Sequence, residues 1–483
     1  MIENNKINYN ALLIKNPTVV NLEITEICNV KCKHCYNPWR DESMGINFFS
    51  KIKLTKVIKN LKNNKIFHVI LSGGEPFSNF AVLTEALKQL NEANISFSCN
   101  TNLILADDKK IKKLASLGLD HCLTSIPSIN EKENDEIMQS KNSLKKIIDG
   151  IKCCIRNGVR VSANMVVTKD NKHRVFETGK LMAELGCSKF FVTRAVPPVY
   201  SEISKNNENK ENTLVLSKEE VKNSLDDALK VKEKYGISIG SLISYPLCFL
   251  GDLQKYRDFV GRGCPSQRGH VININANGDI HTCVHEEETY GNIFKTPLNE
   301  IYNDKMKKWR DGSLHYKECK GCDYLNICNS GCQMTANAVN GQLASKDPLF
   351  VGKDGITNDI NLVLDKKIYD YIENDGTFYV PERVRFRDDE TIYVANPRWG
   401  NMVGLPHDLG LQLEKFKKSK IYFSANDIKI NKNKNDWIAN LFSKDIIESK
   451  IDLKIKKTIT GLSADLLYLP KLNKNINEEE ATT

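Results

Sequence analysis

Short apolar runs alternate with amphipathic stretches between about residues 18 and 200. The runs are VVNLEIT, FHVILSG, ISFSCNTN, DHCLTSI, VRVSANMVVT and KFFVTRAV. The stretches between them carry apolar residues at helical spacing, and several end in Gly or Asn, as helix C-termini do. Six strand–helix units in a row predict an α/β fold with a parallel sheet and right-handed crossovers. Because six units fall short of a closed eight-fold barrel, we expect an open partial (β/α)6 barrel.

The pattern changes twice after this barrel. The polar stretch SEISKNNENKENT (201–213) has no periodicity and predicts an exposed loop. Residues 248–350 lose the alternation and become rich in cysteine. From about residue 376, three short strand patterns precede two amphipathic helix patterns, LGLQLEKFKKS and NDWIANLFSKDIIESK. That order of elements indicates a small winged-helix-like α+β domain.

These changes divide the chain into six predicted parts. They are an N-terminal segment (1–17), the partial barrel (18–240), a cysteine-rich domain (241–352), a linker helix (353–375), the winged-helix-like domain (376–470) and a polar tail (471–483).

Composition limits the class of protein. The 483 residues are 41% hydrophobic and 27% charged, which is ordinary for a soluble globular chain. No run approaches the roughly 18 apolar residues of a membrane span, and the polar N-terminus does not resemble a signal peptide. We therefore expect a cytoplasmic protein with no membrane partner. The net charge of +9 is scattered among acidic residues, so nucleic acid is not an expected partner either.

Three cysteines, Cys28, Cys32 and Cys35, directly follow the first predicted strand. Barrel folds place their chemistry at the carboxyl ends of strands. Three thiols are one short of a closed tetrahedral zinc site, although His34 is adjacent. A zinc knuckle or core packing is therefore one alternative. The other is a [4Fe–4S] cube, which thiolates can hold through three irons while the fourth iron stays open.

The spacing Cys-x3-Cys-x2-Cys with Tyr36 after it resembles the motif of the radical S-adenosylmethionine (SAM) enzymes. The resemblance implies that the amino and carboxylate groups of SAM chelate the open iron. It also implies that one electron from the cluster cleaves SAM to a 5′-deoxyadenosyl radical, which abstracts hydrogen from a substrate. Tyr36 is then a candidate SAM-binding residue.

The segment LSGGEPF (71–77) ends the second predicted strand and resembles the GGEP element of the same family. Gly73 and Gly74 allow close approach to the backbone, and Glu75 can accept a hydrogen bond from an ammonium group. The resemblance assigns them to the amino group of SAM. Ser125, which ends the fourth strand, and Asn164, in the fifth, are candidates for the ribose hydroxyls; a structural role for both is an equal alternative.

A second group of cysteines follows the barrel. It comprises Cys264, Cys283 at the end of GDIHTC, and the run Cys319-x2-Cys322-x5-Cys328-x3-Cys332. Taken alone, paired cysteines of this kind are also compatible with a zinc ribbon. Together with YGNIF (290–294) and LNEIYND (298–304), they resemble the SPASM domain, an extension of radical SAM enzymes that carries auxiliary iron–sulfur clusters.

The family order implies one or two auxiliary clusters in this chain. The first would use Cys248, Cys264, Cys283 and Cys332, and the second would use Cys319, Cys322 and Cys328. The fourth cysteine that relatives supply is replaced by Phe350 in DPLF. We expect either substitution, with Asp347 as the tentative ligand, or an open iron, and we rank both above an empty site.

The other five of the fifteen cysteines lie in predicted strands or helices of the barrel. A reducing compartment makes disulfides improbable, and small buried thiols pack as hydrophobes. We assign to the core Cys99, Cys122, Cys153, Cys154 and Cys187.

The C-terminal stretch that begins RVRFRDDE weakly resembles the peptide chaperone of pyrroloquinoline quinone synthesis and related precursor-recognition elements. Such domains add a leader peptide as a strand at a sheet edge beside a helix. A structural cap is the main alternative. Nucleic-acid binding is disfavoured because the charges are mixed.

Together these resemblances imply a radical SAM peptide maturase. It would install a crosslink or another oxidative change on a ribosomally made precursor peptide with a leader sequence. A reductant protein such as flavodoxin or ferredoxin would supply electrons. The alternatives are a maturase that acts on a whole protein, such as sulfatase formylglycine formation, and a zinc-containing winged-helix regulator.

Overall fold

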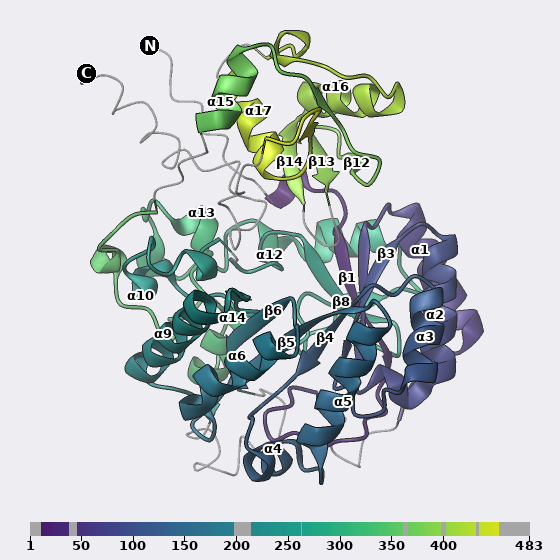
Figure 1. Ribbon diagram of the computed structural model, residues 1–483, viewed down its shortest axis with the longest axis vertical. Coiled ribbons are helices and arrows are strands. Elements are labelled where there is room, and N and C mark those ends of the chain that lie inside the picture. The colour runs from purple at the N-terminus through teal and green to yellow at the C-terminus, as the bar shows by residue number, and fades with distance from the viewer. Residues whose placement is uncertain are drawn as a thin grey trace. The chain divides into compact units, whose positions relative to one another are not determined.

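The computed structural model describes residues 11–37, 46–197, 214–261, 263–360, 366–397, 402–430 and 434–453 (Figure 1). The chain divides into two compact units. Unit 1 comprises Met1–Lys15, Gly251–Gly261 and Ile356–Thr483, and unit 2 comprises Asn16–Leu250 and Arg262–Gly355. The loop predicted at 201–213 and the tail predicted at 471–483 lie outside the described residues.

A parallel sheet forms the centre of unit 2. Its strands are β1 (Val19–Thr25), β2 (His68–Gly73), β3 (Ser96–Thr101), β4 (His121–Ser125), β5 (Arg160–Val167), β6 (Lys189–Arg194) and β7 (Ser238–Gly240). Each strand pairs in parallel with the next. The first six coincide with the six apolar runs, so the predicted α/β sheet is confirmed. The short seventh strand is an addition to the prediction.

Helices connect these strands. They are α1 (Lys51–Asn63), α2 (Phe80–Glu92), α3 (Asp108–Ser116), α4 (Glu131–Met138), α5 (Ser143–Arg156), α6 (Val175–Glu184) and α9 (Lys218–Tyr235). Figure 1 shows α5 and α6 in front of the strands β4 to β6, with α9 beside α6. Close packing explains Gly179 in α6, where a Cβ would stand 2.8 Å from Val231 of α9 and 2.9 Å from the Phe190 ring of β6. These helices cover the outer face of the sheet and so bury its strands, as is usual for parallel sheets.

The two sides of β1 differ in chemistry. Val20, Leu22 and Ile24 are completely buried and face one way, while the alternating residues Asn21 and Glu23 face the other. The Asn21 amide donates to Asn273 Oδ1 at 2.6 Å. The sheet therefore has an apolar side and a buried polar side.

The cysteine-rich segment extends the same sheet at its other edge. Strand β8 (Val271–Ile274) pairs in parallel with β1, and β9 (Asp279–His281) and β10 (Gly291–Asn292) follow in antiparallel order. The result is a ten-stranded sheet in the order β10-β9-β8-β1-β2-β3-β4-β5-β6-β7. The helices of the segment are short: α10 (Leu247–Leu250), α11 (Leu298–Glu300), α12 (Lys307–Arg310), α13 (Leu325–Cys328) and α14 (Gln333–Asn340).

The C-terminal part of unit 1 combines two small sheets with helices. Strands β12 (Arg385–Asp388), β13 (Ile392–Asn396) and β14 (Val403–Pro406) form an antiparallel sheet with β13 in the middle. Strands β11 (Phe378–Tyr379) and β15 (Glu448–Ser449) pair separately. The helices are α15 (Lys366–Glu373), α16 (His407–Lys418) and α17 (Lys434–Ser443). Of the predicted linker helix, α15 is helical, and residues 361–365 lie outside the described part.

A buried apolar cluster joins these elements into one core. It includes Phe378, Ala395 of the central strand, Leu409 and Leu413 of α16, and Ile438 of α17, each at most 1% exposed. In the described part of the whole chain, no helix is both long enough and apolar enough to cross a membrane.

Candidate active site and metal centres

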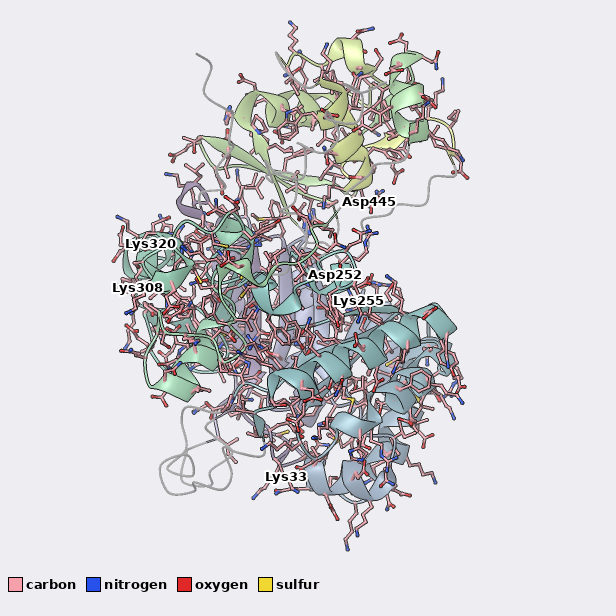
Figure 2. All side chains as sticks on the ribbon, turned by 90° about the vertical axis from the view of Figure 1, so that its left-hand side faces the viewer. Lys33, Asp252, Lys255, Lys308, Lys320 and Asp445 are labelled. Atoms are coloured by element: carbon pink, nitrogen blue, oxygen red, sulfur yellow. The ribbon has the colours of Figure 1, made fainter. Side chains whose placement is uncertain are left out.

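The cysteine loop follows β1 at the carboxyl edge of the parallel sheet. The backbone N–H of Lys33 donates to the carbonyl oxygen of Ile137 at 2.8 Å, which fastens the loop to α4. The N–H of Cys35 donates to the carbonyl oxygen of Cys32 at 3.1 Å, so these two cysteines share a tight turn. The Lys33 side chain is exposed at this end of unit 2 (Figure 2).

The thiol of Cys28 lies near two other groups of this site. Desolvation raises its pKa to about 11, and the charges of Glu75 and Cys35 act in the same direction. Such a thiol is protonated at neutral pH, whereas iron–sulfur clusters are held by thiolates. Bound iron would supply the positive charge that a thiolate needs here, and loading would release a proton. The donor set therefore fits a metal cluster.

Gly73 and Gly74 lie against the backbone of residues 25–27. A Cβ on Gly73 would stand 2.2 Å from the carbonyl oxygen of Thr25, and a Cβ on Gly74 would stand 2.4 Å from that of Ile27. The N–H of Gly74 donates to Thr25 at 2.7 Å. The close approach predicted for a ligand is thus also required by the chain's own backbone, which leaves no space for a larger residue.

Glu75 is 1% exposed and is held on three sides. Its Oε1 accepts from the N–H of Phe77 at 2.9 Å and from Thr101 Oγ1 at 2.7 Å, and its Oε2 accepts from the N–H of Asn102 at 2.7 Å. Desolvation raises its pKa, and these hydrogen bonds oppose the increase. Among the described residues no cation pairs with it. A carboxylate oxygen can accept two hydrogen bonds, so Oε2 can also accept one from an ammonium group.

Ser125 and Asn164 are register partners on β4 and β5, so their side chains lie on the same side of the sheet. The side-chain amide oxygen Oδ1 of Asn164 accepts from Thr193 Oγ1 at 2.6 Å. Asn164 therefore has a structural partner already, while Ser125 is only half-buried at the end of its strand. The structure brings both predicted residues together at the carboxyl edge.

Tyr36 lies between the cysteine loop and the cysteine-rich segment. Its ring centroid is 4.7 Å from that of His285. Desolvation raises the pKa of Tyr36, and the charges of Glu23, Cys35 and Cys283 add to the increase. Tyr36 thus has a thiol of the cysteine loop and a thiol of the cysteine-rich segment as electrostatic neighbours.

Three cysteines, which we call the first sulfur set, are Cys264, Cys283 and Cys332. Desolvation raises the pKa of Cys264 to about 11, and Cys332 adds to the increase. The pKa of Cys283 is also raised by desolvation, with both other members contributing. Backbone N–H groups point at the sulfurs: Thr335 donates to Cys332 Sγ at 3.5 Å at the start of α14. Such donors stabilise thiolates.

Four cysteines form a second sulfur set: Cys248, Cys319, Cys322 and Cys328. Desolvation raises the pKa of Cys328 to about 12, and Cys248 and Cys319 contribute. The same cause raises the pKa of Cys319, again with Cys248 and with Cys322. The structure places Cys248 in this set, whereas the family order had assigned it to the first cluster. Lys320, in the loop between Cys319 and Cys322, is exposed (Figure 2).

Asp347, the tentative iron ligand, is fully engaged elsewhere. Its two oxygens accept from Arg194 Nη1 at 2.8 Å and Nη2 at 2.6 Å. They also accept from the N–H of Leu349 at 2.9 Å and the N–H of Cys332 at 2.9 Å. Burial alone would lower the pKa of Arg194, but the Asp347 charge more than compensates and raises it. The pair joins β6 to the cysteine-rich segment.

Sequence reasoning missed the residues that hold these loops together. The Asn37 amide donates to the carbonyl oxygen of Gly73 at 3.1 Å, and the Asn102 amide donates to Asn29 Oδ1 at 2.8 Å. In the sequence, the only indication of their role was that each is a polar residue near a motif. Across the part of the chain that the structure describes, no three His, Cys, Asp or Glu side chains converge on a site for one metal ion.

Comparisons with known proteins agree with this architecture. Residues 22–182 match the family model of the radical SAM superfamily, and residues 264–323 match that of the SPASM iron–sulfur cluster-binding domain. Pre-heme d1 synthase of Dinoroseobacter shibae is 24% identical over 372 residues, which cover 71% of this chain and 89% of that protein. PqqA peptide cyclase of Gluconobacter oxydans is 24% identical over 333 residues, with coverages of 68% and 88%.

A solved structure shares the fold. Streptococcus suis SuiB, determined with its precursor peptide SuiA, superimposes with a TM-score of 0.56 at 18% sequence identity, covering 70% of this chain and 76% of that one.

The motif, the sheet and these matches define a radical SAM enzyme. More specifically, the chain combines a radical SAM domain with a SPASM domain, and its cofactors are a [4Fe–4S] cluster with SAM and auxiliary iron–sulfur clusters.

Proposed function

We propose that this enzyme is a peptide maturase, which oxidatively crosslinks a ribosomally synthesised precursor peptide. The observation that carries the proposal is the pairing of a radical SAM site with a small antiparallel sheet in unit 1. Two similar proteins support the same substrate class. PqqA peptide cyclase has a peptide in its name, and the solved structure of SuiB contains the precursor peptide SuiA.

The sheet of unit 1 offers edges for strand addition. Strand β13 pairs on both sides, whereas β12 and β14 each pair on one side only among the described strands. An extended leader peptide can add to such an edge through its backbone, with side-chain pockets for specificity. Helix α16 packs on the sheet through Gly410, where a Cβ would stand 2.0 Å from the Cβ of Tyr393. That contact fixes the helix beside the strands.

The barrel residues would hold and orient the cofactor. We assign Cys28, Cys32 and Cys35 to the cluster and Glu75 to the ammonium group of SAM. We assign the backbone at Gly73 and Gly74 to the place where SAM comes close to the chain. When bound, the cluster and SAM supply a radical that removes hydrogen from an unactivated carbon. Ser125 and Asn164 remain our candidates for the ribose, and Tyr36 for the adjoining part of SAM.

The buried polar side of β1 gives the barrel a group that can exchange a proton. Desolvation raises the pKa of Glu23 to about 8, against a hydrogen bond from Asn273. A carboxyl group with a pKa near neutrality can accept or give a proton at working pH. The reductant in our proposal is a flavodoxin or ferredoxin, and the compartment is the cytoplasm.

A tetrapyrrole-modifying reaction is the second candidate. It rests on the similarity to pre-heme d1 synthase and to Fe-coproporphyrin III synthase of Methanosarcina barkeri. A whole-protein maturase is a third. The edges of β12 and β14, each of which pairs with one neighbour among the described strands, favour the peptide, because a planar tetrapyrrole has no backbone to pair with a strand.

The test uses the peptide encoded by a short reading frame beside this one. The full chain, loaded with iron and sulfide without oxygen, is mixed with the peptide, SAM and a reductant. We expect the peptide to lose two hydrogen atoms per crosslink, as seen by mass spectrometry. We also expect amide hydrogen exchange to slow in β12 or β14 when the peptide is added without SAM. An unchanged peptide, with turnover of an added tetrapyrrole instead, would contradict the proposal.

A further inference from the structure

The second sulfur set raises a question of ligand identity. Three of its cysteines, Cys319, Cys322 and Cys328, come from one run of sequence. Phe350 stands where the SPASM relatives supply the fourth thiolate, and it does not point a donor at the set. Its ring instead packs edge-on against Tyr316, with centroids 5.4 Å apart. Its carbonyl oxygen accepts from Lys218 Nζ at 3.0 Å.

Cys248 lies beside residue 350, the position at which relatives supply the fourth cysteine. Desolvation raises the pKa of Cys248, and the backbone N–H groups of Val351 and Gly352, which directly follow Phe350, oppose the increase, so both lie near its sulfur. The backbone approaches equally closely, because a Cβ on Gly355 would stand 2.6 Å from the carbonyl oxygen of Cys248 and 3.1 Å from its Cβ. The loop that carries the missing cysteine in relatives therefore wraps around Cys248 in this chain.

Cys248 is also tied to the other members of the set. The N–H of its neighbour Leu247 donates to Cys328 Sγ at 3.5 Å. The charge of Cys248 contributes to the raised pKa of Cys319 and of Cys328, after desolvation, and Cys322 contributes to that of Cys248. By contrast, the thiols that contribute most to the raised pKa of Cys264 and Cys283, after desolvation, belong to the first set.

We propose that Cys248, from the short helix α10, is the fourth thiolate of the second auxiliary cluster and replaces the cysteine lost at Phe350. Asp347 is not needed for this role, because Arg194 and two backbone N–H groups occupy its oxygens. The first set then keeps three thiolates, Cys264, Cys283 and Cys332, so the iron open to a further ligand belongs to the first auxiliary cluster. This reverses the expectation that the second cluster is the incomplete one.

The first experiment labels thiols in the wild-type holoprotein. The iron-loaded full chain is treated with iodoacetamide without oxygen, digested and mapped by mass spectrometry, before and after iron is removed with a chelator. We expect Cys248 to be protected as strongly as Cys319, Cys322 and Cys328, and to react once the iron is gone. Alkylation of Cys248 in the holoprotein while the other three stay protected would overturn the proposal.

The second experiment compares variants by iron and sulfide content and by electron paramagnetic resonance. Cys248→Ala should change the electron paramagnetic resonance spectrum of one cluster, because one of its irons loses its thiolate while Cys319, Cys322 and Cys328 can still hold the cube. The matched control Cys153→Ala removes a thiol of α5 that lies outside both sets, and should keep all the iron. Phe350→Cys alone should leave iron content and spectrum unchanged, because four thiolates are already present. Full iron and an unchanged spectrum in Cys248→Ala would refute the assignment.

A rescue variant separates ligation from folding. In Cys248→Ala/Phe350→Cys a thiolate is supplied from the position that relatives use. We expect the wild-type signal of the second cluster to return. Return of the signal cannot follow if Cys248 only supports the fold, because the added cysteine restores none of its packing.

Discussion

Glu75 combines a structural and a binding role in one carboxylate. Three hydrogen bonds fix its position at the end of β2, and burial makes its charge unfavourable until a cation is present. In the proposed site the SAM ammonium would supply that cation, so the same side chain would both order the loop and select a positively charged ligand.

Glu75→Gln should therefore weaken SAM binding. The lost charge-assisted hydrogen bond contributes about 1.5–3 kcal/mol, which corresponds to roughly a 10- to 100-fold higher dissociation constant. Equilibrium binding of SAM to the iron-loaded protein measures the effect. The exposed Glu219→Gln in α9 is the control. Unaltered SAM affinity in Glu75→Gln would remove this residue from the site.

Glu23 should make stability depend on pH. Its pKa is about 8 in the folded chain against an ordinary value of 4.5, so the native state binds the proton more tightly than the unfolded state does. Stability then falls as pH rises from 4.5 to about 8, and the loss is complete above that pH. Since each pKa unit corresponds to ~1.4 kcal/mol, the buried charge costs several kcal/mol at pH 9.

Glu23→Gln should remove this dependence. Its denaturant midpoint should exceed that of the wild type at pH 9 and differ little at pH 5, with Glu219→Gln as the neutral comparison. Parallel stability curves for the wild type and Glu23→Gln between these pH values would show that Glu23 does not titrate there.

Motif residues were predictable because their spacing along the chain reflects the chemistry directly. Cys28, Cys32 and Cys35 needed only a short local pattern. The spatial neighbours of Cys248 were not predictable, because they lie about 70 to 100 positions away from it in the sequence. The family order assigns Cys248 to the first cluster, whereas the fold places it beside Cys319, Cys322 and Cys328.

At the scale of elements, the Arg194–Asp347 pair connects the last long barrel strand to the cysteine-rich segment. Both side chains are almost completely buried, at 6% and 1% exposure. Arg194 also donates to the carbonyl oxygen of Ser244 at 2.7 Å. Because Asp347 accepts from the N–H of Cys332, the pair also positions a member of the first sulfur set.

Asp347→Asn should lower the free energy of unfolding by about 3–5 kcal/mol, because it leaves a buried guanidinium without its counter-charge. Arg194→Met in the same chain removes that charge, so the double variant should be less destabilised than the sum of the single variants. Denaturant midpoints of all four proteins complete the cycle. Additive effects would mean that the two side chains are not coupled.

Elements with strong periodicity were predicted, and elements with charged sequences were not. The first six strands and helices such as α5 carry clear apolar faces. Helix α4, EKENDEIM, and helix α9, KEEVKNSLDDALKVKEKY, are dominated by charges, and α9 buries only a narrow stripe that includes Val221, Leu225 and Ala228. The pairing of β8 with β1 was also missed, because local sequence does not report contacts between strands so far apart.

For the whole molecule, we propose separate tasks for separate sets of cysteines. The cysteine loop would serve SAM cleavage, and the two sulfur sets would hold the auxiliary clusters. Replacing Cys28, Cys32 and Cys35 by Ala should abolish 5′-deoxyadenosine formation while about two-thirds of the iron stays bound. Chromatography of the nucleoside products and iron analysis measure the two effects. Continued 5′-deoxyadenosine formation would contradict the assignment of the loop.

The central claim is that the radical acts on a peptide, and hydrogen transfer tests it most directly. The iron-loaded chain is supplied with SAM, a reductant and a perdeuterated form of the precursor peptide, and the 5′-deoxyadenosine is analysed by mass spectrometry. We predict that 5′-deoxyadenosine gains deuterium from the peptide and that the amount of oxidised peptide rises with the amount of deuterated 5′-deoxyadenosine. Oxidised peptide or abundant 5′-deoxyadenosine without any deuterium transfer would contradict the claim.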